Sequence, residues 1–387
     1  MGTDARIVYY MEKQTMIRVL HILHSMNRGG AEVMLMNYYR NIDRSRVQFD
    51  FLLTEQNRCL FEDEIGSLGG KIFRIPLLRM GNPLPYVNGA KRFFREHPEY
   101  RIVHSHTSSK SAVPLWIAKK CGIPVRIAHS HNNKSEEGVS GWVRNFLKIP
   151  LKSVATDFFA CGEEAAKWLF GMEMWNSGNV KILTNAIPVE KFKYNVKQRG
   201  CVRNRYTIQP NTLILGVVAR FSGQKNHMFA LDLMKILKEK ACNAKLLLVG
   251  DGELKNEIVK KVKDLSLEDE VVMTGVVNDV HNYLQAMDMV LMPSINEGLP
   301  VSLIEAQTNG LPVVASTGVP HEVDVTGNVD FLPLEVGGWT NVLLSKMEKG
   351  VTRDADAVEK VRDAGYDIKT ASKKLEEWYL NKYRNQR

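Results

Sequence analysis

Two glutamates in the C-terminal third of the chain have the spacing to hold the hydroxyl groups of a ligand. Glu297 and Glu305 stand eight residues apart in Asn-Glu-Gly-Leu-Pro-Val-Ser-Leu-Ile-Glu. An apolar run precedes them, Gly298 and Pro300 interrupt it, and residues 301–308 predict a helix with proline in its first turn. Unpaired N–H groups at a helix start attract anions, and the carboxylates can accept from hydroxyls. The alternative is a carboxylate that only stabilises the helix start, by about 0.3–1 kcal/mol.

Basic and glycine-containing turns follow other apolar runs of the second half. Arg220 and Lys225 flank a turn ahead of a helical segment. Arginine offers paired hydrogen bonds and lysine a compact charge, so the pair suits a diphosphate; solvated surface cations are the alternative. Gly250 belongs to a Gly-Asp-Gly without the third glycine of a dinucleotide fingerprint, which indicates a tight turn beside a ligand. The segment around Val276 could present backbone groups to a planar base.

The first half offers a glycine pair and four histidines. Gly29 and Gly30 follow the first apolar run and open a helix, where they could admit an anion or form a plain turn. Two histidine pairs end later strands, and i, i+2 spacing puts each pair on one strand face. No acidic or cysteine ligand accompanies them, so the sequence favours a polar cleft wall over a metal site. The wall comprises His104, His106, His129, His131 and Asn132.

The elements that must position these residues alternate between strands and helices. Short apolar runs in two series, separated by amphipathic segments, predict parallel sheets covered on both faces. We therefore expect an α/β protein with two Rossmann-like domains, over residues 16–190 and 191–368, joined through a polar stretch at 185–205. Residues 369–387 predict an amphipathic helix that could pack back on the first domain. Ligands of such sheets bind beyond the carboxyl ends of the strands.

Composition narrows the class of protein. The chain has 387 residues, 44% hydrophobic and 25% charged, with a net charge of +9. Five scattered cysteines without Cys-x-x-Cys predict a reducing cytoplasm. We find no apolar run of spanning length and no signal core. Aromatic and basic residues do not interleave as in single-strand binders, so the charge favours a phosphorylated substrate or an anionic membrane surface over nucleic acid.

The ordered set of motifs resembles the family 4 retaining glycosyltransferases of the GT-B fold, over roughly residues 16–380. It resembles above all the bacterial enzymes of capsule, exopolysaccharide and lipopolysaccharide synthesis. The resemblance implies two Rossmann-like domains whose parallel sheets face each other across a cleft. It also implies a nucleotide-sugar donor, a UDP-sugar by family frequency, bound mainly by the second domain. The motifs are Gly29-Gly30-Ala31-Glu32, His104-x-His106, His129/His131, Arg220…Lys225, Gly250-Asp251-Gly252, Glu297-x₇-Glu305 and Gly310-Leu-Pro-Val-Val-Ala-Ser.

The resemblance also implies roles for the residues on the donor side. Arg220 and Lys225 would hold the diphosphate and offset its charge as it departs. Glu305 would accept from the ribose hydroxyls, and Glu297 would bind the donor sugar with help from backbone N–H groups at Gly298 and Leu299. Cations and helix termini would replace the metal ion of other glycosyltransferases, so neither a metal nor a cofactor is expected.

On the other side of the expected cleft, Gly30 would let the first domain approach the phosphates. His131 best matches the family's histidine beside the reacting sugar, with His129 as the alternative. Two departures affect the loops near the donor sugar: Asn185 is followed by alanine instead of glycine, and Gly318 stands where the family commonly has two glycines.

The expected activity is metal-independent transfer to a saccharide or polyprenyl-diphosphate-linked acceptor in surface polysaccharide synthesis, in the cytoplasm or at the inner membrane face. A same-face substitution is preferred to double displacement, which would need a carboxylate under the anomeric carbon. The alternatives are a nonhydrolysing sugar-nucleotide epimerase and a non-catalytic sugar-nucleotide-binding protein of the same shape. Membrane contact is expected through residues 134–152.

Overall fold

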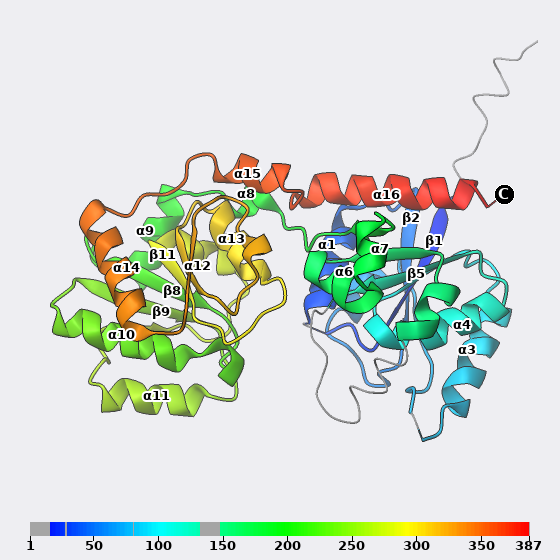
Figure 1. Cartoon of the computed structure of the whole chain (residues 1–387), viewed down its shortest axis with the longest axis horizontal. Helices are drawn as coiled ribbons and strands as arrows, with labels where there is room; N and C mark the ends of the chain where they lie inside the picture. The colour runs from blue at the N-terminus through cyan, green and yellow to red at the C-terminus, as the bar shows by residue number, and fades with distance from the viewer. Residues whose placement is uncertain (1–15, 28, 80, 132–147, 387) are drawn as a thin grey trace, which may run out of the picture. The chain divides into compact units, whose positions relative to one another are not determined.

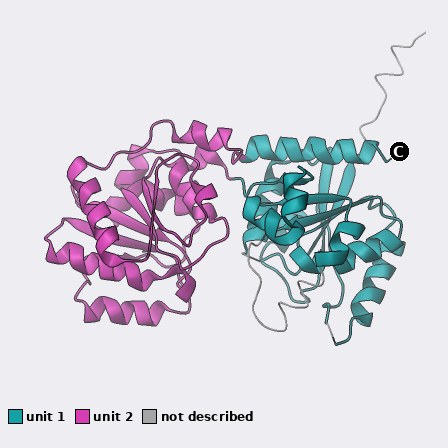
Figure 2. Ribbon diagram, viewed as in Figure 1, with its two compact units in different colours: residues 1–186, 368–387 teal, residues 187–367 magenta. Residues whose placement is uncertain are grey.

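The computed structural model describes residues 16–27, 29–79, 81–131 and 148–386. The chain divides into two compact units (Figures 1 and 2). Unit 1 comprises residues 1–186 together with 368–387, and unit 2 comprises the continuous segment 187–367. Each unit is an α/β domain built on one parallel sheet, with its core between the sheet and the helices that cover it.

Unit 1 contains a seven-stranded parallel sheet in the order β3-β2-β1-β4-β5-β6-β7. Its strands are β1 Ile17–Leu23, β2 Val47–Leu53, β3 Ile72–Arg74, β4 Ile102–Ser105, β5 Val125–Ser130, β6 Asp157–Ala160 and β7 Val180–Ile182. Strand β2 is buried throughout, as expected for a strand with helices on both faces. The order reverses direction between β1 and β4, which creates a topological switch point at their carboxyl ends.

The helices of unit 1 pack on both sides of this sheet (Figure 1). They are α1 Gly30–Asn41, α2 Glu62–Ser67, α3 Leu84–Glu96, α4 Ala112–Lys120, α6 Glu163–Phe170, α7 Met172–Asn176 and α16 Ile368–Arg384. Residues 148–154 are also helical. The last helix, α16, packs beside α1 and buries Leu375 and Tyr379 in the core of unit 1. An apolar stripe on an otherwise charged helix explains this packing.

Unit 2 contains a six-stranded parallel sheet in the order β10-β9-β8-β11-β12-β13. Its strands are β8 Leu213–Val218, β9 Ala244–Val249, β10 Val271–Met273, β11 Met289–Met292, β12 Val313–Ser316 and β13 Val329–Leu332. Its helices are α8 Val189–Phe192, α9 Val196–Arg205, α10 His227–Glu239, α11 Lys255–Asp264, α12 Val280–Ala286, α13 Val301–Thr308, α14 Val336–Lys349 and α15 Ala357–Asp363. The switch point lies between β8 and β11.

The boundary between the units, at residues 186/187, lies within the polar segment 185–205 that was expected to join the domains. Most of this segment is folded, however, because it contains α8 and α9 of unit 2. The side chain of Asn195 caps α9, and Arg199 and Arg203 both pair with Asp288 at 2.6 Å. These charged residues, which suggested a solvent-exposed linker, therefore form ion pairs within unit 2. In the part of the chain that the structure describes, no helix is long and apolar enough to cross a bilayer.

Candidate functional site

The loops at the switch point of unit 2 bring the predicted cation and carboxylate together. The chain after β8 forms a single 3-10 turn at Gly223–Lys225, and Asn226 adopts a left-handed conformation before α10 begins. Lys225 thereby reaches the loop after β11, where its Nζ lies 2.6 Å from Oε1 of Glu297. The two residues are 72 positions apart in sequence, so the sheet order positions this pair.

Backbone contacts hold Glu297 in place. Its N–H donates to the carbonyl of Gly318 at 3.0 Å, and the N–H of Ile295 donates to the carbonyl of Gln224 at 2.8 Å. A Cβ on Gly318 would approach the carbonyl oxygen of Ile295 to 2.1 Å, so glycine is required there. The Glu297 side chain is 7% exposed and that of Lys225 is 21% exposed. The carboxylate is thus fixed and largely shielded from water, which strengthens its attraction to the ammonium group.

The backbone beside Glu297 has free donors. Among the described residues, the N–H groups of Gly298 and Leu299 have no hydrogen-bond acceptor. Helix α13 begins immediately afterwards at Val301, with Pro300 as its N-cap in extended conformation. Unpaired N–H groups before a helix start suit an anion or a sugar hydroxyl.

Arg220 occupies the same edge of the sheet but is held less firmly. Its side chain is 74% exposed and pairs with Glu253 at 3.0 Å. The neighbouring Gly250 has a positive φ of 144°, and a Cβ there would approach the carbonyl oxygen of Ala219 to 2.1 Å. Packing against the Arg220 loop therefore explains Gly250. Val276, after β10, is 67% exposed, and its neighbour Gly275 contacts Gly250 through a backbone bridge.

Glu305 lies inside α13, one turn after its start, as the sequence predicts. Burial raises the pKa of its carboxyl group from 4.5 to about 7, and the positive charge of Lys191 on α8 opposes this shift. A carboxyl group whose pKa lies close to neutral pH is present in both its protonated and its ionised form, so it can donate or accept a hydrogen bond. Perturbed carboxyl groups of this kind concentrate at functional sites.

In unit 1, Gly29 and Gly30 stand at the start of α1. Gly29 is its N-cap, and a Cβ there would collide with the Glu32 carboxylate at 2.2 Å. A Cβ on Gly30 would meet nothing within 4 Å among the described residues. The flexible Glu32 side chain can turn away from the first position, so packing within unit 1 requires glycine at neither position, and it leaves space for a ligand at the second.

The four predicted histidines form one cluster at the carboxyl ends of β4 and β5. The rings of His104 and His106 lie 4.2 Å apart between centroids, and those of His129 and His131 lie 4.0 Å apart. His104 and His129 are fully buried, and His106 is 7% exposed. The expected cleft wall is therefore corrected: stacking hides three of the four rings, and only His131 is partly exposed. Asn132 lies outside the described residues.

Two members of this cluster were not singled out from the sequence. His21 on β1 contacts His106, with Nδ1 and Nε2 3.0 Å apart, and Tyr379 on α16 places its hydroxyl 2.6 Å from Nδ1 of His104. His21 sits in the apolar run Ile-Arg-Val-Leu-His-Ile-Leu, and this polar residue in a buried strand was the available signal. Nothing near Tyr379 in sequence points to a histidine 275 residues earlier.

Imidazole side chains are common ligands of transition metals, so the geometry of the cluster decides whether a metal ion fits it. Two groups, His21/His104/His106 and His106/His129/His131, place ligand nitrogens within 4.8 Å of one another. Neither group includes a carboxylate or thiolate among the described residues. The shortest nitrogen pairs, at 2.9 and 3.0 Å, are at hydrogen-bond distance. Hydrogen bonds between the ring nitrogens account for this spacing, and we assign no metal ion to the cluster.

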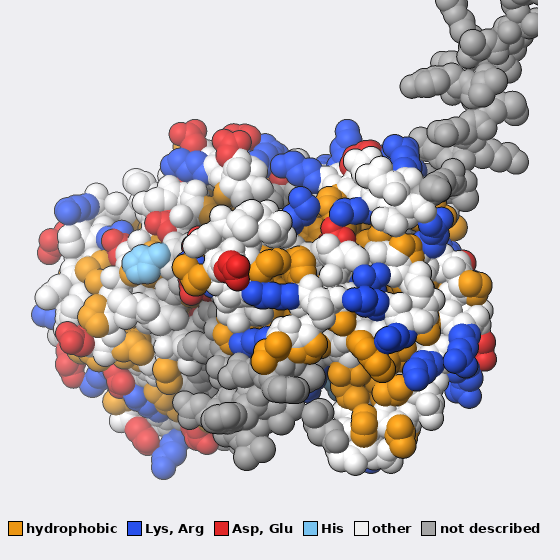
Figure 3. All heavy atoms as spheres, turned by 45° about the vertical axis from the view of Figure 1, so that its right-hand side comes forward, with side chains coloured by type: hydrophobic (Ala, Val, Ile, Leu, Met, Phe, Trp, Pro, Cys, Tyr) orange, Lys and Arg blue, Asp and Glu red, His pale blue; other side chains and the backbone are white. Residues whose placement is uncertain are grey.

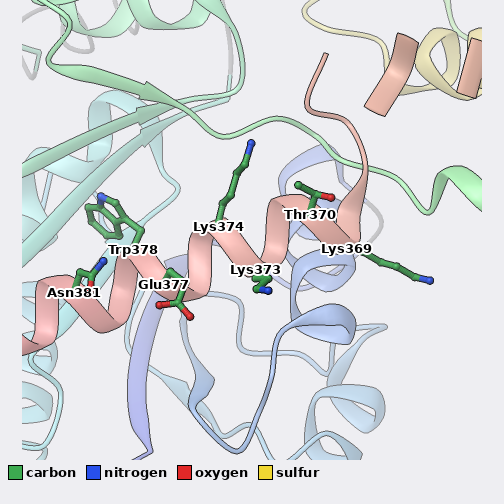
Figure 4. A pocket seen from close by; sticks show the side chains of 7 residues that line it. All are labelled: Lys369, Thr370, Lys373, Lys374, Glu377, Trp378 and Asn381. Atoms are coloured by element: carbon green, nitrogen blue, oxygen red, sulfur yellow. The ribbon is translucent and has the colours of Figure 1, made fainter. Parts of the chain in front are cut away.

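Away from these sites, unit 1 carries a surface hollow of about 680 Å³ along α16. Figure 4 shows its lining side chains on the helix, among them Lys369, Lys373, Lys374 and Trp378. It shares no residue with the histidine cluster or with the predicted donor site, and it is not part of either.

Comparison with known proteins identifies the class to which this fold and site belong. The family model for group 1 glycosyl transferases matches residues 201–329, and that for the glycosyl transferase 4-like domain matches residues 29–165. The chain is 36% identical over 356 residues to the putative glycosyltransferase EpsF of Bacillus subtilis, covering 90% of this chain and 93% of EpsF. The chain belongs to the family 4 glycosyltransferases of the GT-B fold.

Two further comparisons describe particular relatives. The UDP-Gal:alpha-D-GlcNAc-diphosphoundecaprenol alpha-1,3-galactosyltransferase of Escherichia coli is 27% identical over 229 residues, which cover 56% of this chain and 58% of that enzyme. The crystal structure of Anabaena Alr3699/HepE in complex with UDP-glucose superposes with a TM-score of 0.73 and 19% identity, over 94% of this chain and all of that chain. The latter likeness concerns the fold.

Proposed function

We propose that this glycosyltransferase moves a sugar from a UDP-sugar to a saccharide or polyprenyl-diphosphate-linked acceptor during surface polysaccharide synthesis, with retention of configuration. The observation that carries the proposal is the Lys225–Glu297 pair at the switch point of unit 2. The names of the relatives support the substrate classes, since one is a UDP-galactose-dependent enzyme with a diphosphoundecaprenol-linked acceptor and another binds UDP-glucose.

The donor would lie over the carboxyl edge of the unit 2 sheet. Lys225 and Arg220 would contact the diphosphate, and Glu305 would accept from the ribose hydroxyls. Glu297 would orient a sugar hydroxyl while the N–H groups of Gly298 and Leu299 donate to neighbouring oxygens. Gly250 and Val276 of unit 2 would lie beside the nucleotide, and Gly29 and Gly30 of unit 1 would approach the phosphates.

Breaking the anomeric bond builds negative charge on the departing diphosphate and positive character on the sugar. Fixed cations at the diphosphate stabilise that charge without reorganisation during the reaction. We propose that Lys225 and Arg220 do this without a metal ion. Glu297 is engaged with Lys225 at 2.6 Å, which favours a sugar-binding role over nucleophilic attack. A same-face substitution assisted by the acceptor then accounts for retention.

Donor binding is the first test. UDP-glucose and UDP-galactose should raise the melting temperature of the purified protein, because a ligand that binds only the native state stabilises it. At a concentration of 100 times Kd, the added stability is about 2.7 kcal/mol. Thermal unfolding with a panel of UDP-, GDP- and ADP-sugars would check this. Absence of a shift with every nucleotide sugar would contradict the proposal, and sugar isomers formed without an acceptor would favour the epimerase.

We further propose that unit 1 contacts an anionic membrane to reach a lipid-linked acceptor. Most of the segment 134–152 lies outside the described residues, and its described end carries Lys148, Ile149 and Lys152. Ile149 is 72% exposed, and Lys148 lies over the ring of Trp168 at 3.9 Å. Figure 3 shows lysine and arginine side chains near exposed hydrophobic ones on unit 1. Basic and apolar groups together favour an anionic lipid surface.

Replacing Ile149 with glutamate should weaken binding to vesicles of anionic phosphatidylglycerol. The change removes an apolar contact and adds a repelled charge, which together are worth about 2 kcal/mol, or roughly 30-fold in the partition coefficient. Co-flotation at low salt measures it. Val196→Glu is the matched control, because Val196 is 69% exposed in unit 2. Equal losses in both variants, or no retention of the unaltered protein, would exclude this surface.

A further inference from the structure

Three imidazoles in unit 1 form a continuous hydrogen-bonded chain. Nδ1 of His21 lies 3.0 Å from Nε2 of His106, and Nδ1 of His106 lies 2.9 Å from Nε2 of His131. The three residues come from β1, the end of β4 and the end of β5. The backbone N–H of His106, the middle residue, donates to the carbonyl of Ile22 at 2.9 Å and so fixes its position. The chain thus runs from a buried strand to a partly exposed ring.

At neutral pH each of the three rings carries one proton. Burial lowers the pKa of His21 to about 3 and that of His131 to about 4, and it lowers the pKa of His106 well below 6.5. A neutral imidazole has one N–H donor and one bare acceptor nitrogen. The middle ring must therefore donate to one neighbour and accept from the other, so both hydrogen bonds point the same way along the chain.

The buried end decides the direction. Nε2 of His21 has no hydrogen-bond partner among the described residues, and the ring is packed against Phe49 with centroids 4.2 Å apart. If each imidazole donated toward His21, Nε2 of His21 would be a buried N–H without an acceptor. If each imidazole donates outward, toward His131, this nitrogen is only an acceptor without a donor. Buried acceptors without a partner are less rare in folded proteins than buried donors without one. Outward donation requires Nδ1–H on His21, on His106 and on His131.

We propose that His21 and His106 are positioning residues that hold His131 as its Nδ1–H tautomer, so that this N–H is available to donate a hydrogen bond. Nε2 of His131 is occupied as an acceptor, and Nδ1 has no partner in the described structure. His131 then serves as a neutral donor to an oxygen of the bound sugar or phosphate and not as a general base. This role rests on the proposed function, whereas the tautomer itself does not.

Two substitutions at His106 distinguish a hydrogen-bonding role of this residue from a role in packing alone. His106→Asn keeps an amide N–H near the original Nδ1 and can still donate to His131. His106→Leu fills similar volume but donates nothing, so nothing then opposes the Nε2–H form of His131, which prevails for histidine in water. The tautomer of a histidine is set by the hydrogen bond at its other nitrogen, and the two variants differ in whether residue 106 can donate that bond to His131.

Nitrogen-15 NMR of histidine-labelled protein without ligand gives the decisive readout. Protonated and bare ring nitrogens resonate far apart, and a His131→Gln variant assigns the signals. We expect Nδ1–H in the unaltered protein and in His106→Asn, and a majority of Nε2–H in His106→Leu. An Nε2–H form in the unaltered protein, or the same tautomer in both variants, would overturn the proposal. So would stoichiometric zinc in the purified protein that shifts these resonances when EDTA removes it.

Activity tests the consequence separately. His106→Leu should lower kcat about tenfold, the value of one hydrogen bond, with an unchanged KM for UDP-sugar and recovery in His106→Asn. If the tautomers behave as expected but kcat is equal in the two variants, the network stands and the role of His131 in the proposed function fails. If the tautomers are wrong while UDP-sugars still stabilise the protein, the network fails and the donor assignment stands.

Discussion

A Lys225→Met variant should lose about 10²–10³-fold in kcat, equivalent to about 3–4 kcal/mol of transition-state stabilisation. Methionine keeps the length of the side chain but removes the charge that would oppose the developing charge on the diphosphate. It also leaves Glu297 without the ammonium group 2.6 Å away. Initial rates with the UDP-sugar that the binding screen identifies give kcat and KM.

A second lysine separates this effect from the loss of an ordinary ion pair. Lys261 on α11 places its Nζ 2.7 Å from Oδ1 of Asp232 on α10. Its side chain is 27% exposed, and that of Lys225 is 21% exposed. Lys261→Met should leave kcat within about twofold, since such pairs contribute about 0–1 kcal/mol to stability alone. If both variants lose activity equally, or Lys225→Met keeps full activity, Lys225 has no role at the diphosphate.

A Glu305→Gln variant should be more stable than the unaltered protein at pH 8 and about equally stable at pH 4. Burial raises the pKa of Glu305 from 4.5 to about 7. Between these values the native chain holds a proton that the unfolded chain has released, so stability falls as pH rises and levels off above 7. Glutamine is uncharged throughout and avoids a loss on the order of 2–3 kcal/mol. Urea unfolding at several pH values measures it.

The same substitution should weaken UDP binding even as it stabilises unit 2. A carboxylate accepts from both ribose hydroxyls more strongly than an amide, and bonds to a charged group are worth about 1.5–3 kcal/mol. Calorimetric titration with UDP at pH 8 should therefore show an affinity about tenfold or more below that of the unaltered protein. A parallel loss of stability and affinity would mean that the carboxylate serves the fold of α13 instead.

Sequence patterns predicted the two parallel sheets because strand and helix periodicities agree with the turn residues between them. Helix α13, Val301–Thr308, has the bounds that the sequence predicted. Strands β7 and β13 were missed, since each is a short run beside polar residues at a sheet edge. Edge strands need little hydrophobic patterning, because only part of their surface is buried.

The candidate site was predictable to different depths in the two units. Lys225 and Glu297 follow strands that meet at a switch point, so their proximity could be inferred from strand order. The burial of His104 and His129 could not, because it depends on a strand histidine and on a helix at the far end of the chain. Polar residues in buried strands deserve the first look when such a cluster is sought.

The return of α16 to unit 1 has a practical meaning for anyone dissecting the gene. Unit 2 is the continuous segment 187–367, so a single gene fragment can encode it. The other half is discontinuous: a fragment ending at residue 186 lacks Leu375 and Tyr379, two side chains of its interior. A truncation that removes α16 therefore opens the core of unit 1, although the deleted residues follow the whole of unit 2 in sequence.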